Sequence, residues 1–411
     1  MYFRQPAYFG DFRCIGGNCQ FTCCQDWRID MSTEEVEKMK NAPNCSKEML
    51  DIMDKAFVKS NAEGVDYNVK FDKNHKCPLL TEDGYCRVQR ELGAEYLSNI
   101  CMSYPRVNRM ALNINTESYT HVYRYCNLSC IEVSKRLITN KKAMSLINLP
   151  ITKDNSVAKI CMDREENCEE RPELLFRTDM FEFFYALISD NRYSVETAII
   201  NGAIAAGILD DIVKEKQYAA IPQALEEMRE GFLKGNLFRE LDSIKPDYNI
   251  KVGFVGGVIT KSILVNTLSL IRTPDGKLDL SRYFKGEKKL LETMGDNDFW
   301  LRNVALNLLL ELNIPIYLPQ YTILESYSLY MMILACIKLN AIASMSVDTE
   351  GVRLMITDSY YAQFAGNDRI WGFTSLICRE LCQSEEQADK LIQALKDAKL
   401  ITPGQLALLI K

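Results

Sequence analysis

Histidine is nearly absent from this chain of 411 residues, which contains only His75 and His121. Two histidines are too few to build several mixed cysteine–histidine zinc sites. The chain also lacks an apolar run of the ~20 residues that cross a bilayer. Its longest tempting run, Leu329–Ile337, is closed by Lys338. We therefore expect this run to form a buried core helix, and we expect no association with a membrane.

Export and nucleic-acid signals are also missing. The opening Met-Tyr-Phe-Arg-Gln-Pro has no basic segment followed by an apolar stretch and a cleavage site, so we expect no signal peptide and a cytoplasmic protein. The 49 Lys and Arg against 55 Asp and Glu give a net charge of -6. This balance argues against nucleic acid as a partner, because phosphate binding needs a clustered basic excess. Nothing in the sequence indicates an oligomeric state.

Cysteine, in contrast, is abundant and unevenly distributed. Ten of the 15 cysteines lie at or before Cys130. A cytoplasmic chain keeps thiols reduced, so they are not expected to form structural disulfides. The uneven distribution predicts a cysteine-rich metal-binding domain over residues 1–140 and a second domain over 141–411. A chain of this length does not need a metal merely to fold.

The periodicity of the apolar residues predicts a mainly α fold, with the cysteine-rich module packed on an all-helical C-terminal body. Ser32 and Glu35 form a capping box that starts a helix ending near Lys40. Further N-terminal helices are predicted over 88–102 and 131–139, and a strand over 119–125. In the C-terminal part, helices are predicted over 180–188, 258–271, 300–312, 323–345 and 391–400, with helix starts at Ser384 and Thr402. The charged stretch 141–172 is interpreted as a solvated connection.

The strongest feature is a set of nine clustered thiols. Four of them fall within eleven residues, and such close thiolates repel one another unless a cation neutralises them. The nine are Cys14, Cys19, Cys23, Cys24, Cys77, Cys86, Cys101, Cys126 and Cys130. They could complete one or two four-cysteine sites, which suit either zinc or an iron–sulfur cluster. The absence of paired C-x2-C knuckles favours iron–sulfur, with zinc as the alternative. The isolated Cys45, Cys336, Cys378 and Cys382 are expected to be ordinary buried residues.

Four motifs resemble the flagellin lysine-N-methylases, within the wider group of cysteine-rich zinc- or iron-chelating proteins. The first runs from Phe12 through the four clustered cysteines to Trp27, Ile29 and Asp30. The others are Cys77-Pro-Leu-Leu to Tyr104-Pro-Arg106, Leu128-Ser-Cys-Ile-Glu132, and Asn303-Val-Ala-Leu-Asn307 leading to Pro315. In the third motif Ile131 stands where the family usually has proline. Eight cysteines match family positions: Cys14, Cys19, Cys23, Cys24, Cys77, Cys86, Cys101 and Cys130. Cys126 does not match one.

The resemblance implies transfer of a methyl group from S-adenosylmethionine to surface lysines of flagellin or a similar protein. It also implies a 4Fe–4S cluster as the metal centre, held by cysteines among these eight. Methylation requires a neutral lysine amine, and a carboxylate or tyrosine near the acceptor could take its proton. The catalytic candidates are the polar residues closest in sequence to the expected metal: Tyr104, Arg106 and Asp30. Structural roles compete with this interpretation, since Arg106 could instead pair with a carboxylate.

The residues themselves do not reveal how S-adenosylmethionine would bind. A conventional site would show a glycine-rich turn between a strand and a helix, and the nearest candidate, Gly253-Phe-Val-Gly-Gly257, is interpreted as a turn entering an apolar helix. The C-x3-C-x2-C spacing of radical enzymes is incomplete, because Cys19 and Cys23 have no third partner at the required distance. A zinc- or cluster-binding scaffold for a protein partner and a redox protein are the alternative functions.

Overall fold

The computed structural model describes residues 2–19, 22–25, 27–61, 64–113, 118–152, 170–235, 247–258, 267–295, 298–348, 366–382 and 384–411. The chain divides into two compact units. We call the first the helical unit; it comprises Met1–Gly10, Arg109–Ile151 and Met162–Lys411. The second, the cysteine unit, comprises Asp11–Asn108 and Thr152–Cys161. The boundary expected near residue 140 lies inside the helical unit.

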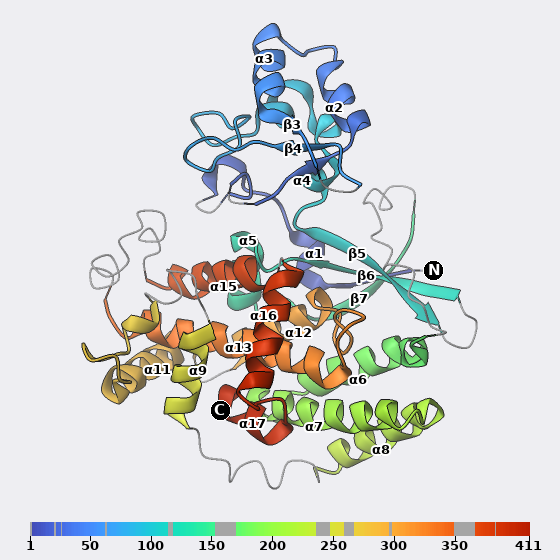
Figure 1. Cartoon of the computed structure of the whole chain (residues 1–411), viewed down its shortest axis with the longest axis vertical. Coiled ribbons are helices and arrows are strands. Elements are labelled where there is room, and N and C mark those ends of the chain that lie inside the picture. The colour runs from blue at the N-terminus through green and yellow to red at the C-terminus, as the bar shows by residue number, and fades with distance from the viewer. Residues whose placement is uncertain are drawn as a thin grey trace. The chain divides into compact units, whose positions relative to one another are not determined.

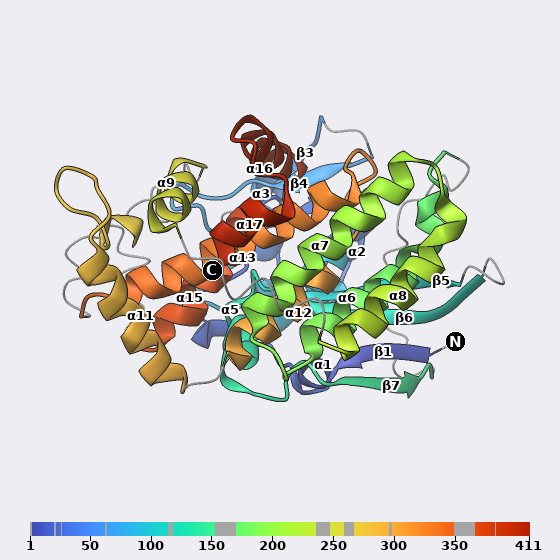
Figure 2. The same ribbon diagram turned by 90° about the horizontal axis from the view of Figure 1, so that it is seen from below.

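The helical unit is built around one long apolar helix, α13 (Ile323–Met345), nearly all of which is buried. It packs against α7 (Val195–Lys214), α11 (Leu280–Met294), α12 (Phe299–Glu311), α15 (Asp368–Leu381), α16 (Glu385–Asp397) and α17 (Pro403–Ile410). Figures 1 and 2 show α13 among these helices. Among the described residues it is the one helix long and apolar enough to cross a membrane, but its apolar window is entirely buried within the protein. The expected core helix is therefore confirmed.

The remaining helices of this unit are α1 (Ala7–Asp11), α5 (Ile131–Thr139), α6 (Arg177–Ser189), α8 (Ile221–Leu233) and α9 (Tyr248–Val258), with short 3-10 turns at Pro172–Phe176 and Tyr218–Ala220. The predicted helices over 131–139, 180–188, 300–312, 323–345 and 391–400 are confirmed. Most of the predicted helix over 258–271 lies outside the described residues. Gly253 lies inside α9, so the expected helix-entry turn is wrong, because the helix already begins at Tyr248.

A four-stranded sheet also belongs to the helical unit. Its order is β5 (Arg106–Asn113), β6 (Ser118–Cys126), β1 (Tyr2–Pro6) and β7 (Leu146–Pro150). Three of its strands come from residues before 140, and β7 is the one described strand within the body 141–411 that was predicted to be all-helical. The parallel β1–β6 pair sets Tyr2 opposite His121, and the antiparallel β1–β7 pair sets Tyr2 opposite Pro150. The predicted strand over 119–125 is confirmed as β6. Strand β7 lies in the stretch 141–172, which was interpreted as a solvated connection. The strand was missed because its pairing partner β1 is about 145 residues away along the chain, so neighbouring residues carry no signal of the pairing.

The cysteine unit combines three short strands with short helices. The sheet has the order β2 (Asp30–Met31), β4 (Tyr67–Val69) and β3 (Phe57–Lys59). The helices are α2 (Thr33–Lys40), α3 (Lys47–Ala56) and α4 (Asn99–Ser103), with single turns η1 (Gly16–Asn18), η2 (Val88–Leu92) and η3 (Ala94–Tyr96). The Ser32–Glu35 capping box of α2 is confirmed. The single helix predicted over 88–102 is wrong, because Gly93 takes a φ of +118° and breaks it into η2, η3 and α4.

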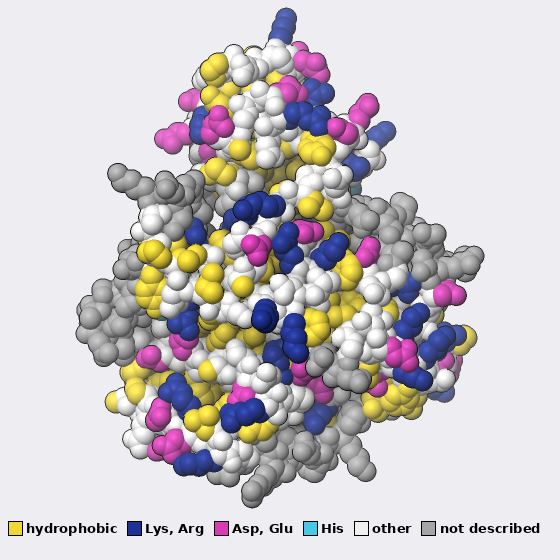
Figure 3. Space-filling view, turned by 180° about the vertical axis from the view of Figure 1, so that it is seen from behind, with side chains coloured by type: hydrophobic (Ala, Val, Ile, Leu, Met, Phe, Trp, Pro, Cys, Tyr) yellow, Lys and Arg dark blue, Asp and Glu magenta, His cyan; other side chains and the backbone are white. Residues whose placement is uncertain are grey.

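Methionine and aliphatic side chains from α2, α3 and the sheet fill the core of the cysteine unit. Cys77, Cys86 and Cys101 pack against the edge of this core, together with Trp27. On the face drawn in Figure 3, exposed hydrophobic side chains are scattered among acidic and basic ones. Three of the predicted ligands therefore contact the core of this unit.

Candidate functional site

Four thiols of the cysteine unit come together: those of Cys24, Cys77, Cys86 and Cys101. Every pair among them is close enough for the charge of one thiolate to raise the pKa of another. The backbone also joins the two cysteine-bearing segments, because the Cys77 N–H donates to the Cys24 carbonyl at 2.8 Å. These four are among the eight predicted ligands, and the structure brings them close together.

Burial raises the pKa of Cys77, Cys86 and Cys101, to about 12 for Cys77 and Cys101, and so keeps these three thiols protonated. Hydrogen-bond donors oppose this effect. The backbone N–H of Leu79 favours the Cys77 thiolate, and the Ser98 hydroxyl favours that of Cys101. The first N–H groups of η2 favour the Cys86 thiolate in the same way. Donors of this kind support metal-bound sulfur, and a bound cation would displace the protons.

The spacing of the side chains bears on the kind of metal. Four thiolates around one zinc ion lie about 3.8 Å apart, since Zn–S bonds are about 2.3 Å long and tetrahedral. Within the described part of the chain, no three His, Cys, Asp or Glu side chains are arranged closely enough to hold a single ion. The four thiols therefore share one region without forming a closed ligand shell around one ion.

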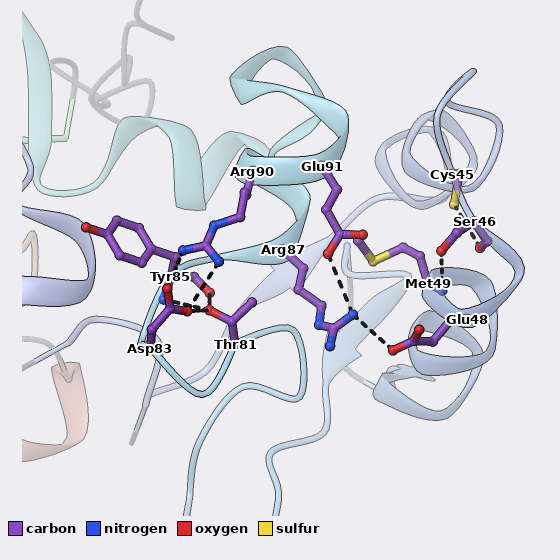
Figure 4. A network of polar contacts seen from close by, with 10 residues as sticks. All are labelled: Cys45, Ser46, Glu48, Met49, Thr81, Asp83, Tyr85, Arg87, Arg90 and Glu91. Atoms are coloured by element: carbon purple, nitrogen blue, oxygen red, sulfur yellow. Dashed lines mark hydrogen bonds and ion pairs between the residues drawn. The ribbon is translucent and has the colours of Figure 1, made fainter.

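The turn that carries Cys14 and Cys19 packs against the loop that leads to Cys86. A Cβ atom at Gly17 would lie 2.4 Å from the Asp83 carbonyl oxygen and 2.5 Å from the Tyr85 ring. The Arg90 guanidinium also lies 4.6 Å from the centroid of this ring (Figure 4). Only glycine permits so close an approach. The first and second cysteine motifs are therefore parts of one packed module.

An ion-pair network holds this loop and the start of η2 (Figure 4). Arg90 pairs with Asp83 at 2.7 Å, and the Thr81 hydroxyl donates to Asp83 at 2.5 Å. Arg87 reaches Glu48 of α3 at 3.1 Å. The arginine pair lowers the pKa of the Asp83 carboxyl to about 2. Because these contacts flank Cys86 on both sides, they fix the position of its backbone.

The remaining predicted ligands lie in different settings. Cys14 is exposed, with the Gly16 N–H 3.5 Å from its sulfur, and Cys19 and Cys23 are partly buried in the cysteine unit. Cys130 belongs to the helical unit, where it forms the N-cap of α5. Their role as ligands stays a prediction.

The three predicted catalytic residues all belong to the cysteine unit and all have partners there. Asp30 pairs with Arg28 at 2.6 Å and accepts a hydrogen bond from the Asn68 amide at 2.8 Å. The Tyr104 ring packs on Trp27, with the ring centroids 5.1 Å apart. The Arg106 guanidinium lies 4.8 Å from the centroid of the Phe12 ring. These contacts stabilise the module, and the catalytic roles of the three residues stay predictions.

The third and fourth sequence motifs meet in the helical unit. Asn303 of α12 donates to the Leu137 and Asn140 carbonyls at 2.9 Å each. One turn further on, Asn307 donates to the Cys126 carbonyl at 3.0 Å and accepts from the Tyr8 hydroxyl at 2.6 Å. Glu311 continues the same face of α12, and its Oε2 accepts from the Leu128 N–H at 2.9 Å.

Sequence reasoning identified the two asparagines and missed Glu311. The signal was present, because positions 303, 307 and 311 are each four residues apart and share one helix face. The last three residues of this helix face therefore bind the backbone of the segment that contains Cys126, Leu128 and α5.

Comparison with known proteins matches residues 181–409 to the FliB lysine N-methylase C-terminal domain. A lysine-N-methylase of Salmonella choleraesuis and one of Salmonella typhimurium are each 27% identical over 263 residues, 61% of this chain. The chain spans 59% of the length of these two relatives. The flagellar biosynthetic protein FliU of Salmonella muenchen is 30% identical over 142 residues, 34% of this chain and 80% of that protein.

No solved structure matches the chain. The family match covers more than half of the sequence, including α12, α13 and α15, and confirms the resemblance found in the motifs. The chain belongs to the FliB lysine N-methylase family.

Proposed function

We propose that this protein is a lysine N-methyltransferase that transfers a methyl group from S-adenosylmethionine to surface lysines of flagellin or a similar protein in the cytoplasm. The observation that carries the proposal is the family match over residues 181–409, supported by two relatives named lysine-N-methylase and one named as a flagellar biosynthetic protein. The chain spans 59% of the length of the two methylases, and their activity is extended to it here as a proposal.

We further propose that Cys24, Cys77, Cys86 and Cys101 hold a 4Fe–4S cluster. Four neighbouring thiols suit such a cluster, and N–H or O–H groups are directed at the sulfurs of Cys77, Cys86 and Cys101. The absence of paired C-x2-C knuckles in the sequence favours a cluster over zinc. When bound, the cluster would supply a redox-active and Lewis-acidic centre. The ordered turn around Gly17 and the Asp83–Arg90 pair would hold the cysteines in place for it.

Anaerobic purification tests the metal centre. A cluster gives broad absorption at about 400 nm together with iron and acid-labile sulfide. Cys77→Ser and Cys101→Ser should lose this absorption, while Cys45→Ser, a cysteine on the same core, should keep it. A colourless protein containing zinc would overturn the cluster and favour the alternative of a zinc scaffold that docks a protein partner.

Incubation with labelled S-adenosylmethionine and flagellin tests the transferase. We expect label on flagellin lysines, located by mass spectrometry, and no label with a Cys24→Ser, Cys77→Ser variant. A Cys45→Ser variant serves as the matched control. If the unaltered protein transfers no more label than the double variant, the transferase proposal is wrong, and a stable complex with flagellin would then point to the scaffold function.

A further inference from the structure

The carboxylate of Glu311 is a buried polar group with unused bonding capacity. The residue is 9% exposed, and its Oε2 accepts the single hydrogen bond from Leu128. Its Oε1 is buried without a hydrogen-bond partner. A buried carboxylate oxygen without a partner costs free energy, so its retention calls for an explanation.

The neighbouring members of the same helix face do not share this feature. Asn307 uses both its amide nitrogen and its carbonyl oxygen in hydrogen bonds to Cys126 and Tyr8. Asn303 places its amide nitrogen between two backbone carbonyls of the α5 segment. The asparagines therefore fasten the helix to this segment, whereas Glu311 has an oxygen directed at no group of the protein.

The surroundings of this oxygen are poor hydrogen-bond donors. Cys378 and Cys382 lie one turn apart at the end of α15, hydrogen-bonded to each other, and both thiols interact with Glu311. Helices α12, α13 and α15 and the β6–α5 turn meet here, as Figures 1 and 2 allow the reader to follow. The titratable and charged groups that act on the carboxylate or are acted on by it are Arg109, Tyr8, Tyr317, Cys378 and Cys382.

Burial raises the pKa of Glu311 to about 7, against the opposing effect of Arg109. The same burial keeps both neighbouring thiols neutral, because it raises their pKa as well. Tyr317 and Cys382, two of the groups that interact with Glu311, are partly exposed. A cation bound at Oε1 would pair with one carboxylate that has two neutral thiols beside it.

We propose that Glu311 binds the ammonium group of the substrate lysine through Oε1 and accepts its proton before methyl transfer, an inference that rests on the proposed function. A lysine side chain suits this environment, with an aliphatic stem to pack against thiols and an ammonium group to pair with the carboxylate. The free oxygen of Glu311 then acquires the donor that it lacks within the protein.

The proposed step balances as follows. One N–H bond of the ammonium breaks, and the proton moves to Glu311 and from there to water. The freed nitrogen lone pair forms the N–CH3 bond, the sulfonium C–S bond of S-adenosylmethionine breaks, and the sulfur keeps the electron pair. The products are methylated lysine, S-adenosylhomocysteine and one proton. Glu311 takes part only in the proton transfer.

The first test needs no methyl transfer. n-Butylammonium chloride reproduces the end of a lysine side chain, and 1-butanol has the same chain without the charge. At pH 8 and matched ionic strength, we expect n-butylammonium to raise the melting temperature of the full chain more than 1-butanol does. Glu311→Gln should abolish this difference, and Glu325→Gln, which keeps a residue able to cap α13, should retain it. An equal response in all three proteins would overturn the inference.

The second test uses the transferase assay. Glu311→Gln should lower the methyl-transfer rate by about 100-fold or more and remove the fall in rate below neutral pH, as expected on loss of a general base. Glu325→Gln should keep both. Transfer by Glu311→Gln within a few fold of the unaltered protein would refute the role of Glu311 and leave the proposed function standing. If the unaltered protein transfers nothing, the proposed function fails, and the n-butylammonium comparison alone decides the binding role.

Discussion

Replacing Glu311 by glutamine should make the protein more stable at neutral and alkaline pH. The pKa of this carboxyl rises from 4.5 in the unfolded chain to about 7 in the folded protein. Between these values the folded state binds more protons than the unfolded state does. The free energy of unfolding therefore falls as the pH rises through this interval, and the loss is complete above the folded pKa.

The size of the effect follows from the shift. A rise of about 2.5 pKa units at about 1.36 kcal/mol per unit gives about 3 kcal/mol. Glutamine is nearly isosteric, can still accept from the Leu128 N–H, and never ionises. Glu311→Gln should thus match the unaltered protein near pH 4.5 and exceed it by up to this amount at pH 8. Other titrating groups, such as His121, are present in both proteins and cancel in the difference.

Urea unfolding at pH 5, 6, 7 and 8 measures this difference. Tryptophan fluorescence is a suitable signal, because Trp300 and Trp371 both lie in the helical unit. The Glu325→Gln variant should show no such pH dependence relative to the unaltered protein. A difference that is constant from pH 5 to pH 8, or a variant that is less stable at pH 8, would mean that folding does not raise the pKa of this carboxyl, and our account of its burial would be wrong. A variant that is more stable yet inactive would identify a residue retained for function.

Three further changes test contacts inside each unit and the proposed metal site. Gly17→Ala should lower the free energy of unfolding by about 1–3 kcal/mol, because the new Cβ would meet the Asp83 backbone oxygen. Gly404→Ala is the control and should change this free energy little, because no atom lies within 4 Å of a Cβ at that position. Urea unfolding measures both. Cys77→Ser should reduce bound iron to background in a colorimetric assay. Asn307→Ala should cost about 2–4 kcal/mol in the same urea experiment, because it leaves the Tyr8 hydroxyl and the Cys126 carbonyl without their shared partner. Loss of less than about 0.5 kcal/mol would show that solvent replaces that partner.

Local signals in the sequence determined the elements whose cause is local. The capping residues Ser32, Ser384 and Thr402 each accept a hydrogen bond from a backbone N–H three residues later, as their spacing predicts. The apolar period of α13 was sufficient to identify a core helix. The clustering of cysteines predicted metal binding in the N-terminal part, which stays a prediction, and the motifs identified the family. Each of these properties depends on residues that are neighbours along the chain.

The sequence was least informative where distant segments meet. Strand β7 gave no signal because its register is set by β1 at the start of the chain. The sequence does not tell which of the eight matching cysteines lie together, and the closeness of Cys24, Cys77, Cys86 and Cys101 became visible only in the folded chain. The spare oxygen of Glu311 depends on which groups of α15 and the β6–α5 turn face it. Composition and spacing thus indicated which kinds of reactive side chain this protein has. Tertiary packing decided which of these side chains lie close together, because the whole core sets the distances between residues that are remote in the sequence.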